Sequence, residues 1–213
     1  MNEYNVGDLI SDFLFENDLK TVFGVVSVHN IPILDAIAKR NLIKFIPARG
    51  EMGAGHMADG FARSSDKVGV VITSTGPGAA NVVGSLVEAR FAGTPLLHIT
   101  GQTATENLDK NQGTVHDVPN QLDMLKSVSK NAYRISSSKN VLDVLEKALE
   151  EAMSPPTGPV SIEVPIDVQR TIINRQETFN KVVINDKNIS VGDLNSLDLI
   201  EEEIRKSKRK ILW

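Results

Sequence analysis

The sequence of 213 residues contains no cysteine, which excludes disulfides, thiolate nucleophiles and cysteine-bound zinc. It also lacks an apolar run of the ~20 residues that a membrane-spanning helix needs. Its first residues are acidic where a secretory signal peptide is basic. Lysines and arginines are scattered and the formal net charge is -4, so no broad basic patch for nucleic acid is present. We therefore expect a cytoplasmic protein that binds neither membranes nor nucleic acids.

Apolar strand candidates, separated mostly by helices, predict a doubly wound α/β domain. The runs VGVVIT and PLLHIT are apolar on both faces, as buried parallel strands are. We expect a mainly parallel six-stranded sheet with helices on both faces. Helices are predicted at 6–17, 31–40, 51–63, 80–91 and 140–153, and strands at 21–26, 43–48, 68–74, 95–100 and 159–166, with a short further segment at 124–135.

A polar stretch from Gly101 to about Pro119 contains few apolar residues and predicts a long loop. Loops of this length are uncommon inside compact domains and are often functional. The stretch is therefore either a wall of a substrate or cofactor site or a mobile surface connection, and the sequence favours neither interpretation.

The alternating pattern ends near Val168, so we predict a first domain at residues 1–170. Residues 171–192 have no clean period and are typical of an interdomain linker. Residues 193–213 predict a helix that runs into a strand ending at Trp213. Because a lone strand leaves its backbone groups unpaired, we expect this segment to be the truncated start of a central domain of a longer protein.

The most distinctive local feature is RGEMGAGHMADGFAR, residues 49–63, where a strand gives way to a helix rich in small residues. Each of its glycines costs a helix about 1 kcal/mol relative to alanine, which indicates a close packing partner or a ligand. Glu51 stands at the junction. From spacing alone, Glu51 is either a functional carboxyl or an ordinary acidic residue in a first helical turn, where the helix dipole favours it.

The turn STGPG, residues 74–78, joins a strand to a helix and either holds a ligand or only satisfies tight backbone geometry. It matches neither the nucleotide phosphate loop nor the G-x-G-x-x-G fingerprint. The four histidines are far apart and have no metal-ligand spacing, so we predict no metal site in this chain. His98 lies in an apolar strand and is expected to be a hydrogen-bonded core residue.

Several segments, taken in order, resemble the N-terminal domain of acetolactate synthase and related thiamine-diphosphate enzymes: FGVVSVHNIPILDAI, PARGEMGAGHMADGFAR, TSTGPGAANVVGSLVEA, PLLHITGQT and GPVSIEVPIDVQ. The resemblance covers about residues 3–170, and LNSLDLIEEEIRKSKRKILW resembles the opening of that family's central domain. It implies the thiamine-diphosphate-binding fold, in which one domain binds the aminopyrimidine ring and another holds Mg²⁺ and the diphosphate. The family's diphosphate signature begins Gly-Asp-Gly, which is absent here. The resemblance therefore implies a pyrimidine-binding half, inactive without its complementary domain.

The same resemblance implies roles for individual residues. Glu51 matches the glutamate that hydrogen-bonds to N1′ of the pyrimidine and activates the cofactor, which requires a group that both donates and accepts a proton. The residues expected to bind the cofactor with it are Thr75, Gly76, Pro77, Gly78, Asn81 and Gln102. The residues expected in the substrate cleft are Ser27, His29, Gln112 and His116.

The resemblance further implies a lyase or transferase acting on a small 2-oxo acid, assembled as a homodimer or homotetramer. Val28 stands where related decarboxylases often carry an acid, and Val26 where they usually carry proline. Both disfavour a simple pyruvate decarboxylase and leave an acetolactate-synthase-like carboligase, an oxidase or a lyase. Two alternatives stay open: a separate small subunit of a two-chain 2-oxo acid decarboxylase, and a non-catalytic binding protein with the same fold.

Overall fold

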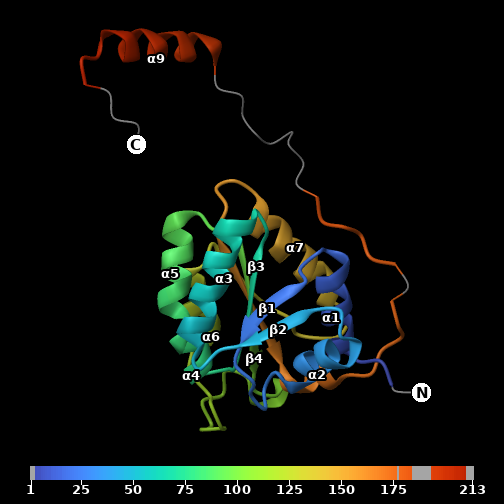
Figure 1. Ribbon diagram of the computed structural model, residues 1–213. Coiled ribbons are helices and arrows are strands. Elements are labelled where there is room, and N and C mark those ends of the chain that lie inside the picture. Colours follow the sequence, from blue (N-terminus) through green and yellow to red (C-terminus); the bar gives the residue numbers. More distant parts are fainter. Residues whose placement is uncertain (1–2, 177, 184–192, 210–213) are drawn as a thin grey trace.

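The computed structural model describes residues 3–176, 178–183 and 193–209 (Figure 1). At its centre is a six-stranded sheet with the order β2-β1-β3-β4-β6-β5. All the strand pairs are parallel, which confirms the predicted doubly wound α/β fold. The strands are β1 (Thr21–Gly24), β2 (Lys44–Pro47), β3 (Gly69–Thr73), β4 (Leu96–Gln102), β5 (Asn131–Arg134) and β6 (Pro159–Pro165).

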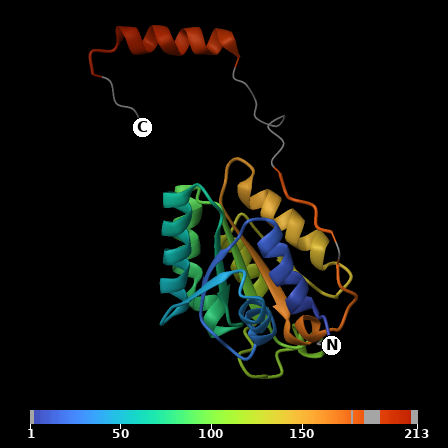
Figure 2. The same ribbon diagram turned by 45° about the vertical axis from the view of Figure 1, so that its right-hand side comes forward.

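Helices cover both faces of the sheet, and Figure 2 shows α3 and α5 on one side with α1 and α7 on the other. Val70 and Ile72 of β3 pack in the core cluster beneath α1, α2 and α7, whereas Val71 packs in the cluster beneath α3, α5 and α6. This alternation is what a strand buried on both faces requires. The helices are α1 (Val6–Glu16), α2 (Ile31–Arg40), α3 (Glu51–Ser65), α4 (Pro77–Asn81), α5 (Val83–Ala92), α6 (Gln121–Val128), α7 (Val141–Met153), α8 (Ile166–Arg170) and α9 (Leu194–Lys206).

The structure differs from the sequence prediction in several segments, one of them the unpredicted helix α8. The helix expected at 80–91 is divided into α4 and α5 at Val82. The short segment at 124–135 contains the end of α6 and the strand β5. Helix α6 is only 8 residues long and buries only Gln121 and Leu125, so its apolar stripe is too short to give a helical pattern.

The predicted long loop is confirmed from Thr103 to Asn120, where the only regular element is the short 3₁₀ helix η1 (Thr105–Asn107). Its first two predicted residues, Gly101 and Gln102, belong to β4 instead. Figure 1 shows this loop in yellow-green below the sheet. It leaves the carboxyl end of β4 and returns to α6.

The segment after α8 runs back along the domain body. Ile172 forms an antiparallel bridge with Asn5, and the Ile173 N–H donates to the Tyr4 carbonyl at 2.9 Å. Phe179 and Val182 pack against the core beneath α1 and α7. Helix α9 coincides with the predicted helix after residue 193, whereas residues 210–213 of the predicted strand lie outside the described residues. In the described part of the chain, no helix has the length and apolar character needed to cross a bilayer.

The glycines of α3 have different surroundings. A Cβ at Gly55 would lie 1.9 Å from Ser85 Oγ and 2.7 Å from Ser85 Cβ, so only glycine lets α3 and α5 approach this closely. A Cβ at Gly60 would have nothing within 4 Å. The close packing partner expected from the sequence is therefore α5. Packing against α5 explains the glycine at position 55 but not the glycine at position 60.

This difference predicts opposite effects of the same substitution. Gly55→Ala is expected to lower the free energy of unfolding by about 1–3 kcal/mol, because the added methyl overpacks the α3–α5 contact. Gly60→Ala is expected to raise it by up to about 1 kcal/mol, because alanine has the higher helix propensity. Urea denaturation of both variants tests this, and equal effects would contradict the assigned packing.

Candidate functional site

The predicted site residues follow strands that end at one edge of the sheet. The chain passes from β1 outward to β2 and then crosses to β3 on the other side of β1. Ligands of open α/β sheets bind outside the carboxyl ends of the strands, at such a reversal. Ser27 and His29 follow β1, Glu51 follows β2, and the turn 74–78 follows β3. Four strands thus deliver polar residues to this edge, since Gln102 ends β4.

Glu51 is the first residue of α3, and its N-cap Gly50 offers no side-chain cap to the helix. Asn81 Nδ2 donates a hydrogen bond to Glu51 Oε2 at 3.2 Å. Oε1 accepts no hydrogen bond among the described residues, so it is free for a ligand. A Cβ at Gly78 would lie 2.9 Å from Glu51 Oε1, so glycine at this position keeps the space beside the carboxyl open.

The turn after β3 is fixed by its backbone and by Gln121. Gly76 has φ +58, and a Cβ there would lie 2.1 Å from the His116 carbonyl oxygen, so both conformation and space demand glycine. The Gly76 N–H donates to Gln121 Oε1 at 2.6 Å. The Thr75 hydroxyl lies 2.8 Å from the same oxygen and 3.0 Å from Gln102 Oε1.

A buried polar network continues from this turn into the sheet. Gln121 Nε2 donates to Glu163 Oε2 at 3.0 Å, and Gln102 Nε2 donates to the same oxygen at 3.3 Å. The fully buried Glu163 forms an ion pair with Arg134, which also pairs with Asp109 of the long loop at 2.6 Å. Sequence reasoning missed Gln121, Glu163 and Arg134. The one available signal was the charge of Glu163 within the apolar run PVSIEVPI.

The residues predicted to bind the cofactor lie in two places. Glu51, Gly78 and Asn81 lie together beside the turn, and Pro77 begins α4 next to them. Thr75 and Gln102 are buried beneath the turn and belong to the polar network, so their contact with a cofactor stays a prediction.

The four residues expected in the substrate cleft do not all lie together. Ser27 Oγ lies 2.6 Å from Ser74 Oγ, and the rings of His29 and His116 lie 5.4 Å apart, so three of these residues gather at the ends of β1 and β3. Gln112 is exposed in the loop and makes no hydrogen bond among the described residues.

His98 is the hydrogen-bonded core residue that the sequence predicts. Its Nε2 lies 2.9 Å from Thr73 Oγ1 and its Nδ1 lies 3.0 Å from Ser161 Oγ. Burial lowers the pKa of His98 to about 3, so the imidazole is neutral at physiological pH.

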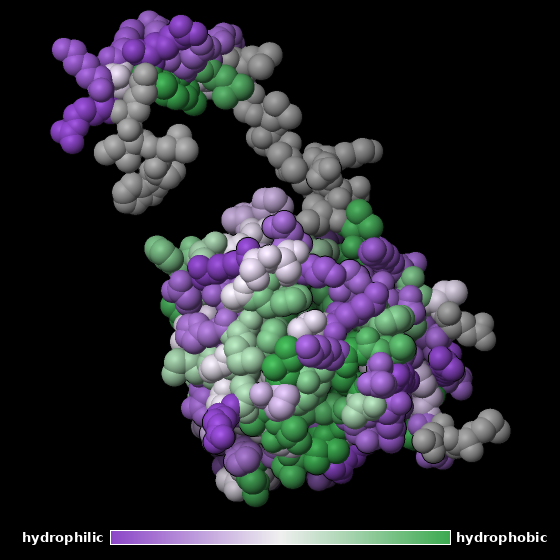
Figure 3. Space-filling view, viewed as in Figure 1, coloured by the Kyte–Doolittle hydropathy of each residue, from purple (hydrophilic) through white to green (hydrophobic). Residues whose placement is uncertain are grey.

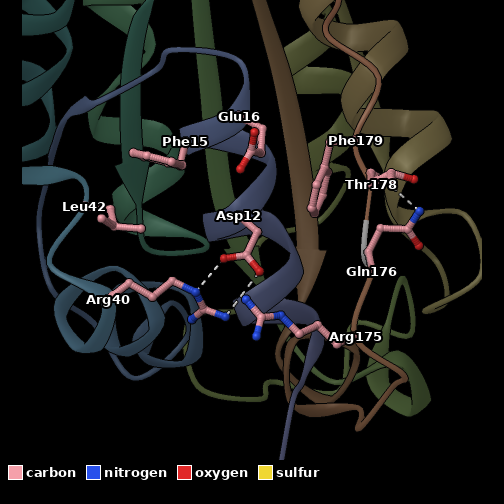
Figure 4. Close-up of a pocket in the computed structure, with 9 residues that line it drawn as sticks. All are labelled: Asp12, Phe15, Glu16, Arg40, Leu42, Arg175, Gln176, Thr178 and Phe179. Carbon is pink, nitrogen blue, oxygen red and sulfur yellow. Dashed lines mark hydrogen bonds and ion pairs between the residues drawn. The ribbon is translucent and has the colours of Figure 1, made fainter.

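A cavity of about 650 Å³ opens elsewhere, between α1, α2 and the segment after α8 (Figure 4). Arg40 is held there by Asp8 at 2.6 Å and by Asp12 at 2.5 Å. None of the predicted site residues lines this cavity. The cavity is therefore separate from the residues at the sheet edge. Its lining residues are Asp12, Phe15, Glu16, Arg40, Leu42, Arg175, Gln176, Thr178 and Phe179.

The profile of one protein family, "Thiamine pyrophosphate enzyme, N-terminal TPP binding domain", matches residues 4–124. The chain belongs to this family. The matched region contains the whole glycine turn and Glu51. The resemblance inferred from the sequence motifs is confirmed.

Relatives of this thiamine pyrophosphate enzyme domain include acetolactate synthases. The mitochondrial catalytic subunit from Saccharomyces cerevisiae is 33% identical over 167 residues, which cover 78% of this chain and 24% of that protein. Isozyme 1 large subunit from Escherichia coli is 33% identical over 168 residues, covering 78% and 29%. The large subunit from Lactococcus lactis is 32% identical over 195 residues, covering 92% and 32%. The chain thus spans between 24% and 32% of the length of these relatives.

The hydrogen bonds of Gln121 predict its contribution to stability. Gln121→Leu leaves the Gly76 N–H without its acceptor and removes a donor from the buried Glu163, which is expected to lower the free energy of unfolding by about 1–3 kcal/mol. The matched control Gln112→Leu lies in the exposed loop and is expected to change it by less than about 0.5 kcal/mol. Urea denaturation measures both, and a tolerated Gln121→Leu would show that the network does not support the turn.

Proposed function

We propose that this chain binds the aminopyrimidine ring of thiamine diphosphate at the edge between β1 and β3, with Glu51 activating the cofactor through a hydrogen bond to N1′. The observation that carries the proposal is the Glu51 carboxyl itself. One oxygen is held by Asn81, the other has no partner among the described residues, and Gly78 leaves the adjacent space open. A carboxyl oriented in this way can exchange a proton with a ring nitrogen.

The surrounding residues fit the cofactor's ring. Gly78 keeps the turn free of a side chain beside Glu51, and Asn81 orients the carboxyl without neutralising it. When bound, thiamine diphosphate supplies an acidic thiazolium carbon and an electron sink for cleaving and forming carbon–carbon bonds. We assign Mg²⁺ and the diphosphate to a complementary domain, because the Gly-Asp-Gly signature is missing from this sequence.

The proposed reaction is decarboxylation or ligation of a small 2-oxo acid, as in acetolactate synthase. Support comes from the relatives named above and from the loop after β1. Val26 and Val28 expose 61% and 59% of their surface there. Val28 stands where related decarboxylases often carry an acid, and Val26 stands where they usually carry proline. This favours a carboligase over a simple decarboxylase.

We also propose that the outer face of α3 and α5 binds another protein domain, either a second copy of this chain or the complementary domain. Met52, Met57 and Val87 are exposed on this face, and Phe91 exposes 90% of its surface. Gly53 and Gly60 of α3 are open to the outside with no atom near them, which leaves room for close approach of a partner. Figure 3 shows apolar residues gathered over the middle and lower part of the domain body.

The role of Glu51 can be tested in the enzyme reconstituted with its complementary domain. Glu51→Gln is expected to lower kcat by about 10²–10⁴-fold, because an amide cannot exchange the proton. Exchange of the thiazolium C2 proton with solvent, followed by NMR, is expected to slow in parallel. The control Glu150→Gln lies exposed on α7 and is expected to leave both rates unchanged. Unchanged turnover in Glu51→Gln would refute the assignment.

The division of the cofactor between two domains can be tested by calorimetry. Thiamine diphosphate with Mg²⁺ is expected to bind weakly or not at all to this chain alone, and to bind when the complementary domain is added. Binding without any C2 proton exchange would instead support the non-catalytic alternative. Full activity on mixing with one separately encoded chain would support the small-subunit alternative.

A further inference from the structure

His29, beside the proposed cofactor site, has an unsatisfied ring nitrogen. The residue exposes only 9% of its surface, and its Nδ1 is buried with no hydrogen-bond partner among the described residues. A buried polar atom without a partner carries a desolvation cost, which a ligand that supplies the missing partner recovers. The unpaired Nδ1 of His29 is therefore available to form a hydrogen bond with a ligand.

The backbone holds the His29 ring in this position. A Cβ at Gly101 would lie 2.3 Å from the His29 carbonyl oxygen and 2.7 Å from its Cβ, so glycine at the end of β4 is required for the contact. The His29 carbonyl also accepts a hydrogen bond from Gln169 Nε2 at 2.7 Å. The imidazole is thus seated against the end of β4 while His116, from the long loop, covers it.

The same cluster adjoins Glu51. The backbone N–H of His29 donates to Ser27 Oγ at 3.3 Å, and Ser27 Oγ lies 2.6 Å from Ser74 Oγ. A Cβ at Gly78 would touch both Ser74 and Glu51, at 2.7 Å and 2.9 Å respectively. Ser27, Ser74 and Gly78 thus form a path of contacts from His29 to the carboxyl proposed to activate the cofactor.

His29 is held in its neutral form. Burial lowers the pKa of His29, and the nearby charges of His116 and Arg170 lower it further. A neutral imidazole offers one N–H donor and one acceptor without adding charge. The exposed side chains of Val26 and Val28 in the same loop have no polar atom. His29 therefore supplies a hydrogen-bonding side chain to a partly apolar surface.

Building on the proposed function, we propose that His29 is a substrate-binding residue that donates a hydrogen bond to an oxygen on the side chain of the substrate. The cleft then selects 2-oxo acids whose side chain carries a hydroxyl, carbonyl or carboxylate over those with an alkyl side chain. A site built to hydrogen-bond such a group discriminates strongly against an analogue that lacks it.

The test compares hydroxypyruvate with pyruvate in the enzyme reconstituted with its complementary domain. The wild type is expected to have the higher kcat/KM for hydroxypyruvate. His29→Leu is expected to reduce that ratio by about ten- to hundredfold, mainly through the KM for hydroxypyruvate, with pyruvate measured on the same variant as the reference substrate. His29→Gln retains a donor and is expected to restore part of the preference. An unchanged ratio in His29→Leu would overturn the proposal.

Cofactor measurements separate this test from a failure of the proposed function. If wild-type enzyme binds thiamine diphosphate and exchanges its C2 proton but His29→Leu keeps the substrate ratio, only the role of His29 is wrong. If the wild type does neither, the proposed function is wrong.

A second measurement needs no turnover. In NMR titration of this chain, His29 is expected to ionise below 6.5, and His116→Asn is expected to raise that pKa because a neighbouring positive charge is removed. Asparagine suits residue 116, whose φ is +65. Ionisation of His29 at or above 6.5 would contradict a neutral donor and overturn the proposal.

Discussion

The hydrogen bond between the Gly76 N–H and Gln121 Oε1 is the constraint on which the site geometry depends. It fixes the turn in which Gly78 packs against the Glu51 carboxyl and Gly76 packs against the backbone of His116. Gln121 can act in this way because its amide is itself oriented by the buried Glu163. An amide with both ends bonded has one orientation, and a turn bonded to it has one conformation. Gln121 and Glu163 therefore determine the position of the proposed cofactor site without having to contact a ligand.

The sequence predicted the parts of the structure that depend on local pattern. Apolar runs such as VGVVIT, the small-residue helix after Glu51 and the Gly-Pro-Gly turn are all visible within a few residues, and each appears where expected. Gln121 and Glu163 were missed because they lie 42 residues apart in the chain, and their pairing exists only after β6 has joined the sheet. The seating of His29 against Gly101 is likewise a contact between two strand ends, which no local pattern encodes.

The contacts of the long loop disfavour one of the two interpretations that the sequence left equal, a mobile surface connection. Three contacts hold it: Asp109 pairs with Arg134, the Thr105 N–H donates to Asp167 at 3.0 Å, and the His116 backbone rests on Gly76. A loop held along its length by an ion pair, a hydrogen bond and a backbone contact is suited to form a wall of the cleft. Because Arg134 bridges Asp109 and the buried Glu163, the same charges that support the turn also hold the loop.

The antiparallel bridge between Asn5 and Ile172, here called the clasp, joins the chain before α1 to the chain after α8. Beyond the clasp, Phe179 and Val182 cover apolar surface beneath α1 and α7, and the Val182 N–H donates to Asn17 at 2.9 Å. These contacts hold chain beyond the proposed boundary at residue 170 against the domain body. Removing this segment from the domain would expose to water the apolar surface that Phe179 and Val182 cover, and exposed apolar surface promotes aggregation.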